Sequence, residues 1–172
     1  MKLKTVFVSI LLIPVVSFAS AFPSISGKTL LNQAIKVPNQ ASLQLLILGF
    51  DMTSADPMEA WVRGLNLVPS SNISWVQIPV IGPVPPFVDG FIKRGMKKSM
   101  SKDIQRAFFP YFGNKKDDIL KSIQGSETLA DSSTPFIVLI AADGTIEFAK
   151  QIQASTENIQ FIESKISKII VR

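Results

Sequence analysis

The stretch Leu43–Trp61, LQLLILGFDMTSADPMEAW, decides the fold of this chain. Its first part, Leu43–Phe50, is almost wholly apolar, which is typical of a strand buried on both faces of an open α/β sheet. A short loop then leads into a helix, for which Asp56 is the predicted cap and Pro57 the first helical residue. Free backbone N–H groups gather where such a helix begins, and α/β proteins usually keep their ligand sites there.

The N-terminal residues have the pattern of a signal peptide. Two lysines precede the apolar run Val6–Phe18, and Ala19-Ser20-Ala21 then matches the A-x-A cleavage signal. We therefore expect residues 1–21 to direct export, so that the protein is periplasmic or secreted. Residues 22–172 are long enough to form one domain with its own core. A retained signal anchor is the alternative reading of the apolar run.

The sequence contains neither cysteine nor histidine. The absence of thiols excludes disulfides and every thiolate mechanism. The absence of imidazoles excludes Ser-His-Asp catalysis and removes the commonest zinc ligands. Asp51, Asp56 and Asp143 are the carboxylates to consider for a metal, but a helix cap and a turn account for the last two. We therefore expect no metal, no cofactor and no catalytic residue.

The rest of the chain continues the alternation of strands and helices, with no internal repeat. Beyond the first strand, we expect an edge strand or hairpin at 29–34, helices at 57–67, 87–100, 115–123 and from 156 onward, a second buried strand at 73–81 parallel to the first, a short edge strand at 107–112, and a hairpin of strands 135–141 and 146–151.

This order of elements resembles the thioredoxin-like superfamily, in the arrangement with an inserted helix and strand that peroxiredoxins use. Thr134-Pro135, followed by FIVLIAADGTIEF, is similar to the cis-proline strand and hairpin of that superfamily. The resemblance implies an α/β thioredoxin-like fold: a central mixed sheet flanked by helices, ending in a β-hairpin and a helix. It also implies a structural cis-proline at Pro135, facing the loop Asp51–Asp56. The reactive cysteine of these families would fall in that loop, where this chain has none.

Three shorter pieces resemble the family of the mitochondrial ATP synthase assembly factor ten. They are EAWVRGL, WVQIPVIG and, above all, FVDGFIKRGMKKSM. That family is thioredoxin-like and acts on the membrane sector of the synthase rather than on disulfides. The resemblance implies a non-catalytic protein that binds or helps to assemble a membrane complex.

Positive charge is concentrated in one part of the chain. The net charge of +5 falls to +3 without Lys2 and Lys4, and residues 93–116 alone hold +7, which leaves −4 elsewhere. Such a window attracts anionic partners. The candidate contacts with a protein partner or an anionic membrane surface are Lys93, Arg94, Lys97, Lys98, Lys102 and Phe91. A solvated helix face is the plain alternative.

Within the predicted helix Phe87–Met100, apolar residues recur at helical spacing on more than one side. If Phe87, Phe91 and Met96 pack on the sheet, Val88 and Ile92 are left near solvent.

Two functional hypotheses follow. The first is a non-catalytic, cysteine-free protein that is exported and binds or helps to assemble a membrane complex. The second is a cysteine-independent enzyme or small-ligand-binding protein that uses the loop Asp51–Asp56. The missing cysteine and histidine, together with the basic helix, favour the first. Export argues against a nucleic-acid partner.

Overall fold

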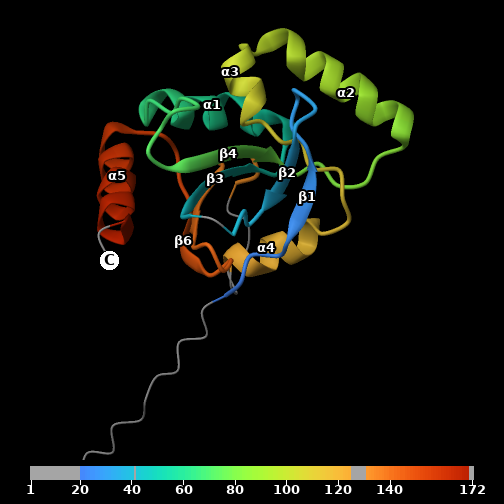
Figure 1. Cartoon of the computed structure of the whole chain (residues 1–172). Coiled ribbons are helices and arrows are strands. Elements are labelled where there is room, and N and C mark those ends of the chain that lie inside the picture. Colours follow the sequence, from blue (N-terminus) through green and yellow to red (C-terminus); the bar gives the residue numbers. More distant parts are fainter. Residues whose placement is uncertain (1–19, 41, 125–130, 171–172) are drawn as a thin grey trace, which may run out of the picture.

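A four-stranded mixed sheet forms the centre of the protein, in the order β4-β3-β5-β6 (Figure 1). Its strands are β3 (Gln44–Gly49), β4 (Ser74–Pro79), β5 (Phe136–Ile140) and β6 (Ile146–Gln151). The computed structural model describes residues 20–40, 42–124 and 131–170. The predicted signal peptide therefore lies outside the described residues, except for its last two. The sheet confirms the predicted α/β class.

The central strands carry the longest buried runs, as their apolar sequences predict. All six residues of β3 and all five of β5 are buried. β3 pairs in parallel with β4 and antiparallel with β5. β5 and β6 form the predicted antiparallel hairpin. In the turn between them, Gly144 has a φ of 92°, a conformation that glycine adopts at no steric cost.

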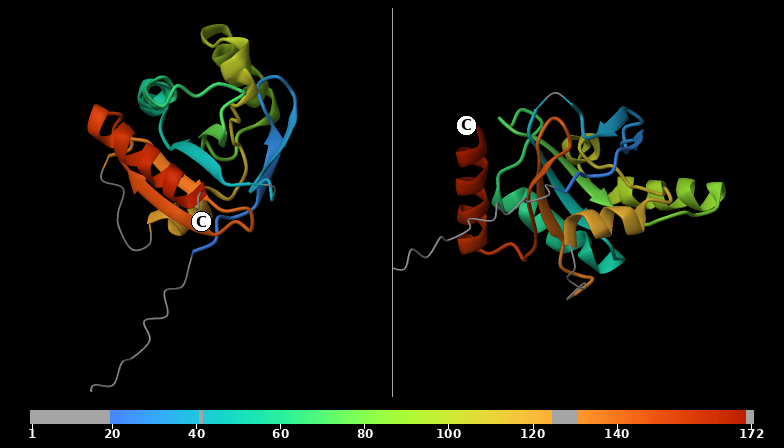
Figure 2. Two further views of the ribbon diagram at one scale, coloured as in Figure 1. Left: turned by 60° about the vertical axis from the view of Figure 1, so that its left-hand side comes forward. Right: turned by 90° about the horizontal axis from the view of Figure 1, so that it is seen from below.

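Helices cover both faces of this sheet. The helical elements of the described chain are the 3-10 helix η1 (Met52–Ser54), α1 (Ala55–Gly64), α2 (Pro86–Ser99), α3 (Lys102–Arg106), α4 (Lys116–Gln124) and α5 (Thr156–Ile170). Side chains alternate along β3, so Leu45 and Ile47 pack with α1 and α5, whereas Leu46 and Leu48 share a core with α4. Figure 2 shows α2 at the far end of the molecule from α5, extending away from the sheet.

A separate two-stranded antiparallel sheet precedes the main one and consists of β1 (Ile25–Lys28) and β2 (Ala34–Val37). Of the two alternatives for residues 29–34, the hairpin is the one that forms. Most of that stretch is the turn rather than a strand, because Thr29 N donates to Gln33 O at 2.9 Å. Asn32 has a φ of 61° there, which an extended strand cannot contain.

The start of the first long helix differs from the prediction. Asp51 is the capping residue, because its Oδ1 accepts a hydrogen bond from Thr53 N at 2.8 Å and begins η1. α1 follows at once from Ala55, so Asp56 lies inside the first helical turn and is not its cap. The chain turns immediately after β3, and the first side chain able to cap takes that role.

The segment between α3 and α4 also differs from the prediction. Residues 107–112 form no continuous strand and make two isolated parallel bridges, from Phe108 to Gln77 of β4 and from Tyr111 to Val80 just after it. Pro110 lies between these bridges and has no N–H to donate to a ladder. α3 was not predicted, because its five residues are too few to show a helical period.

Candidate functional site

The loop after β3 satisfies its own polar groups. Asp51 Oδ1 accepts hydrogen bonds from the backbone N and from the hydroxyl of Thr53, both at 2.8 Å. The backbone hydrogen bond, with the hydroxyl next in importance, holds the pKa of Asp51 below its ordinary value of 3.8. Ser54 is buried and donates its hydroxyl to Asp51 O at 2.5 Å. The side chains of Asp51, Thr53 and Ser54 are therefore already engaged within the loop.

A second carboxylate, Asp131, lies close enough for its charge to raise the pKa of Asp51, against the larger effect of the hydrogen bonds. Its oxygens accept hydrogen bonds from Ser133 N at 2.9 Å, from Ser133 Oγ at 2.6 Å and from Thr134 Oγ1 at 2.8 Å. The Ser133 hydroxyl is the first cause of the lowered pKa of Asp131. Each carboxylate thus serves its own turn, which weakens the case for a ligand site at Asp51–Asp56.

The predicted cis peptide bond before Pro135 is wrong, because this bond is trans; in the described part of the chain the cis bond is Val37–Pro38. The trans chain enters β5 as an extended segment. Pro135 O accepts from Ile152 N at 3.2 Å, and Thr134 O accepts from Gln151 Nε2 at 3.0 Å. Pro135 is therefore a strand-starting residue beside β6 in this chain.

Residues 20–40, 42–124 and 131–170 contain no group of three or more carboxylates placed to hold a metal ion. The same residues include no helix that is long and apolar enough to cross a membrane.

α2 presents an exposed aromatic and basic face. No residue of α2 is fully buried, and Phe87 and Phe91 are 80% and 76% exposed. A Cβ added at Gly90 or Gly95 would meet nothing within 4 Å, so both glycines also face open space. We define the outer face of α2 as the exposed residues that follow one another at helical spacing: Phe87, Gly90, Phe91, Arg94, Gly95 and Lys98.

The inner side of α2 carries the remaining apolar residues, so the condition that Phe87 and Phe91 pack on the sheet is not met. Val88, Ile92 and Met96 are half-buried, while Phe87 and Phe91 point outward. Lys97 lies on this inner side, half-buried, and its carbonyl accepts from Gln105 Nε2 of α3 at 3.1 Å. The half-buried side chains of Val88, Ile92 and Met96, together with this hydrogen bond to α3, orient the helix so that Phe87 and Phe91 face water.

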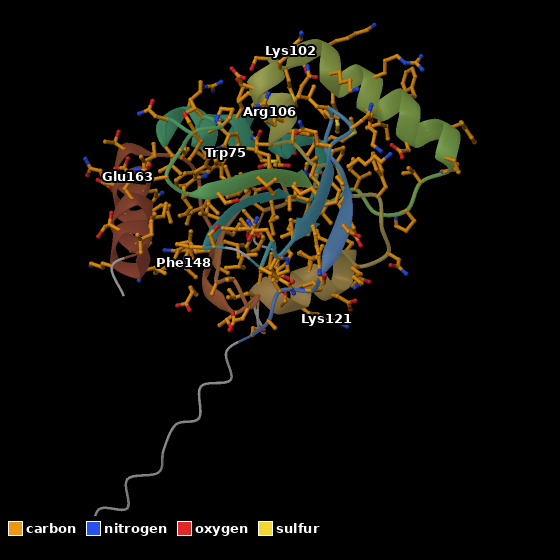
Figure 3. All side chains as sticks on the ribbon, viewed as in Figure 1. Trp75, Lys102, Arg106, Lys121, Phe148 and Glu163 are labelled. Carbon is orange, nitrogen blue, oxygen red and sulfur yellow. The ribbon has the colours of Figure 1, made fainter. Side chains whose placement is uncertain are left out.

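Lys93 also lies on the inner side of α2. Its Nζ is 2.8 Å from an oxygen of Asp89 and 5.3 Å from the centre of the Phe112 ring. Lys102 is exposed at the start of α3 (Figure 3).

The structure therefore brings together three of the predicted contact residues, Phe91, Arg94 and Lys98, on the outer face of α2. Lys93, Lys97 and Lys102 lie elsewhere. Phe87 joins the face although the sequence prediction did not include it as a contact. Its spacing of four from Phe91 was the available signal.

No protein-family model matches the sequence, and no curated protein matches it. Solved structures do match. The thioredoxin domain of a thiol-disulfide oxidoreductase from Bacteroides vulgatus has a TM-score of 0.53 at 14% identity, over 88% of this chain and 98% of that one. An exposed lipoprotein thioredoxin from Streptococcus pneumoniae has a TM-score of 0.54 at 7% identity, over 83% and 99%. A member of the Sco family of cytochrome c oxidase assembly proteins has a TM-score of 0.52 at 12% identity, over 86% and 94%.

The chain has a thioredoxin-like fold. Identities of 14% and below support this statement about the fold and nothing about activity. Thiol–disulfide exchange needs a thiolate, and this thioredoxin-like chain contains no cysteine to supply one.

We expect the purified protein to be inactive in insulin reduction and in peroxide consumption. The loop where a thioredoxin-like enzyme would place its nucleophile contains hydroxyls and carboxylates instead. Rates should equal those of buffer blanks, with an active thioredoxin as the positive control. Turnover above the blank that persists after a second, different purification would contradict this expectation.

Proposed function

We propose that this protein is a non-catalytic, exported thioredoxin-fold protein that docks on an anionic membrane surface through the outer face of α2. One observation carries the proposal: Phe87 and Phe91 stand one helical turn apart in water, on a helix whose outer face continues with Arg94 and Lys98. Aromatic residues beside basic ones are the composition of helices that lie in the membrane interface.

The energies of such a contact suit reversible docking. Burying one phenylalanine contributes about 1.5–3 kcal/mol. Each basic side chain close to an anionic surface adds roughly 1 kcal/mol. Phe87 and Phe91 with Arg94 and Lys98 can therefore hold the protein at a membrane without anchoring it permanently. The charge component acts only near contact, because the Debye length is about 8 Å at physiological salt.

The same proposal extends to assembly of a membrane complex of the ATP synthase type. The longest piece that resembles the assembly factor family, Phe87–Met100, is the piece that presents the outer face of α2. Among the fold neighbours, the Sco-family member belongs by name to the assembly proteins of another membrane complex. Docking through α2 would bring the protein to its partner within the plane of the membrane.

Two double variants separate the aromatic from the electrostatic part of this docking. Phe87→Ser with Phe91→Ser, and Arg94→Gln with Lys98→Gln, should each weaken binding to vesicles that contain phosphatidylglycerol. We expect a loss of more than about tenfold for the first pair, since about 1.4 kcal/mol corresponds to tenfold. Binding of the parent should fall with added salt and be weak on purely zwitterionic vesicles. Flotation with the vesicles is the measurement.

The control variants make the same kinds of substitution at positions outside the outer face of α2. Lys121→Gln with Lys168→Gln removes two exposed charges from α4 and α5, and Val68→Ser removes an exposed apolar side chain. Figure 3 shows Lys121 below the sheet, whereas α2 lies above it. These variants should bind like the parent, and all variants should keep the parent thermal midpoint. If both α2 variants bind vesicles as the parent does, membrane docking through α2 is refuted.

A capture experiment tests the assembly component by itself. The tagged parent and the α2 variants are incubated with detergent-solubilised membranes, and ATP synthase subunits are scored by specific antibodies. Retention by the parent and loss in the α2 variants is the expected result. If the parent retains the ATP synthase subunits but does not bind vesicles, the partner of α2 is a membrane-embedded protein and not the lipid surface.

A further inference from the structure

A cavity separates β1 from the segment that follows α3. Its volume is about 380 Å³, and it is lined by residues 24–28 on one side and by residues 109–113 on the other. The two segments run antiparallel and are joined at both ends. Leu30 N donates to Phe108 O at 3.0 Å, and Lys115 Nζ donates to Ser24 O at 2.9 Å. Between these two hydrogen bonds the two backbones are not paired, and the Phe109 ring packs against β1 at Gly27.

The second segment cannot close the gap, because its backbone is used by β4. Phe109 N donates to Gln77 O at 2.8 Å, and Tyr111 N donates to Pro79 O at 2.9 Å. Pro110 has no N–H at all. In the middle of this segment the side that faces β1 therefore has no donor, which interrupts any regular ladder with β1.

β1 in turn has a free edge that faces the cavity. The hydrogen bond from Thr29 N to Gln33 O is the first bond of the ladder between β1 and β2. In an antiparallel ladder, the backbone N–H and C=O groups of successive residues point alternately toward and away from the partner strand. The backbone groups of Ser26 and Lys28 therefore point away from β2. Leu30, which has the same parity, donates to Phe108 O, and this places the free edge on the cavity side. Within the described residues, no backbone hydrogen bond outside the β1–β2 ladder involves Ser26 or Lys28.

The cavity is lined by positive charge and aromatic rings. Lys28, Lys93 and Lys115 border it, and no acidic residue does. Lys93 is neutralised by Asp89, but neither Lys28 nor Lys115 forms an ion pair with any residue that the structure describes. Phe109, Tyr111 and Phe112 line the opposite side. The cavity thus combines an open strand edge with two lysines that lack ion-pair partners among the described residues, of which Lys115 also holds Ser24 O.

We propose that this cavity binds an extended peptide segment of a partner protein that carries carboxylate side chains and adds to the free edge of β1. The outward C=O groups of Ser26 and Lys28 require N–H donors, which a compact anion lacks and a peptide supplies at strand spacing. The lysines require negative charge. Residues 1–19 contain no carboxylate, so the N-terminal stretch of this chain does not have the required chemistry. This site is independent of docking by the outer face of α2.

The test measures fluorescence anisotropy with the full chain and a labelled short peptide of alternating valine and aspartate. We expect saturable binding, a loss of about tenfold or more when the aspartates are replaced by asparagines, and abolition when alternate backbone amides are N-methylated. Lys28→Gln with Lys115→Gln should weaken binding about tenfold, which corresponds to about 1.4 kcal/mol. The charge-matched Lys121→Gln with Lys168→Gln should leave it unchanged.

Three results would overturn the proposal. The first is the absence of saturable binding to the acidic peptide. The second is equal binding by the N-methylated peptide together with displacement by citrate, which would make the cavity a simple anion site. The third is unchanged binding by the Lys28→Gln/Lys115→Gln protein when its circular dichroism and thermal midpoint match those of the parent.

Discussion

Replacing Trp61 with alanine should lower the free energy of unfolding by about 3–5 kcal/mol. Trp61 is fully buried in α1, in the core that α1 and α5 form on one face of the sheet. Its Nε1 donates to Ile152 O at 3.1 Å and so joins α1 to the segment after β6. Alanine would leave a cavity and remove the donor from that carbonyl. Single domains are stable by only about 5–15 kcal/mol, so the loss is a large share of the whole.

Urea unfolding followed by the fluorescence of the remaining tryptophan, Trp75, measures this loss. Trp61→Phe keeps a buried aromatic ring but removes the hydrogen bond, and its cost should lie well below that of alanine. Met52→Ala changes a side chain that is 94% exposed and should stay within about 0.5 kcal/mol of the parent. A Trp61→Ala protein that unfolds at the parental urea concentration would show that this core is not formed as described.

Replacing Gly49 with alanine should destabilise the protein by about 1–3 kcal/mol through overpacking. The new Cβ would collide with Ser54 Oγ and lie 2.5 Å from Met58 Sδ and 3.2 Å from Ser54 Cβ. Ser54 cannot simply move aside, because it is 1% exposed and its hydroxyl is bonded to Asp51 O. The strain would therefore displace the loop that connects β3 to α1.

Gly64→Ala is the matched control, since its Cβ would meet the flexible end of the Ile159 side chain rather than a held loop. Alanine also favours the helical conformation over glycine by about 1 kcal/mol, which offsets a small shift of Ile159. The two variants should therefore separate clearly in calorimetric midpoint, with Gly49→Ala the lower. A Gly49→Ala protein as stable as Gly64→Ala would show that β3 and η1 are not packed together.

The loop after β3 shows how far local sequence reasoning reaches. The buried strand and the helix after it were predictable, because an apolar run and a helical period are local signals. The capping residue was not, since both Asp51 and Asp56 suit a cap and only the path of the chain selects Asp51. The extended segment before β5 likewise depends on partners distant in sequence, because Gln151 and Ile152 donate hydrogen bonds to Thr134 O and Pro135 O.

The orientation of α2 was decided by packing. Periodicity shows that a helix has apolar stripes, but here two stripes compete, one with Phe87 and Phe91 and the other with Val88, Ile92 and Met96. Which stripe turns inward depends on the shape of the surface beneath and on the tie to α3. The sequence prediction therefore located the basic helix correctly but left open which stripe faces the sheet.

The sequence by itself determined the chemistry that this protein lacks, because the absence of cysteine and histidine holds in any fold. It also determined the buried strands of the sheet, because their apolar runs leave no other stable arrangement in water. Only the tertiary structure decided which residues meet at a surface: Phe87 and Phe91 beside Arg94, and the edge of β1 across a cavity from Tyr111. These neighbours come together through the packing of segments that are far apart along the chain, and no local sequence pattern encodes such packing.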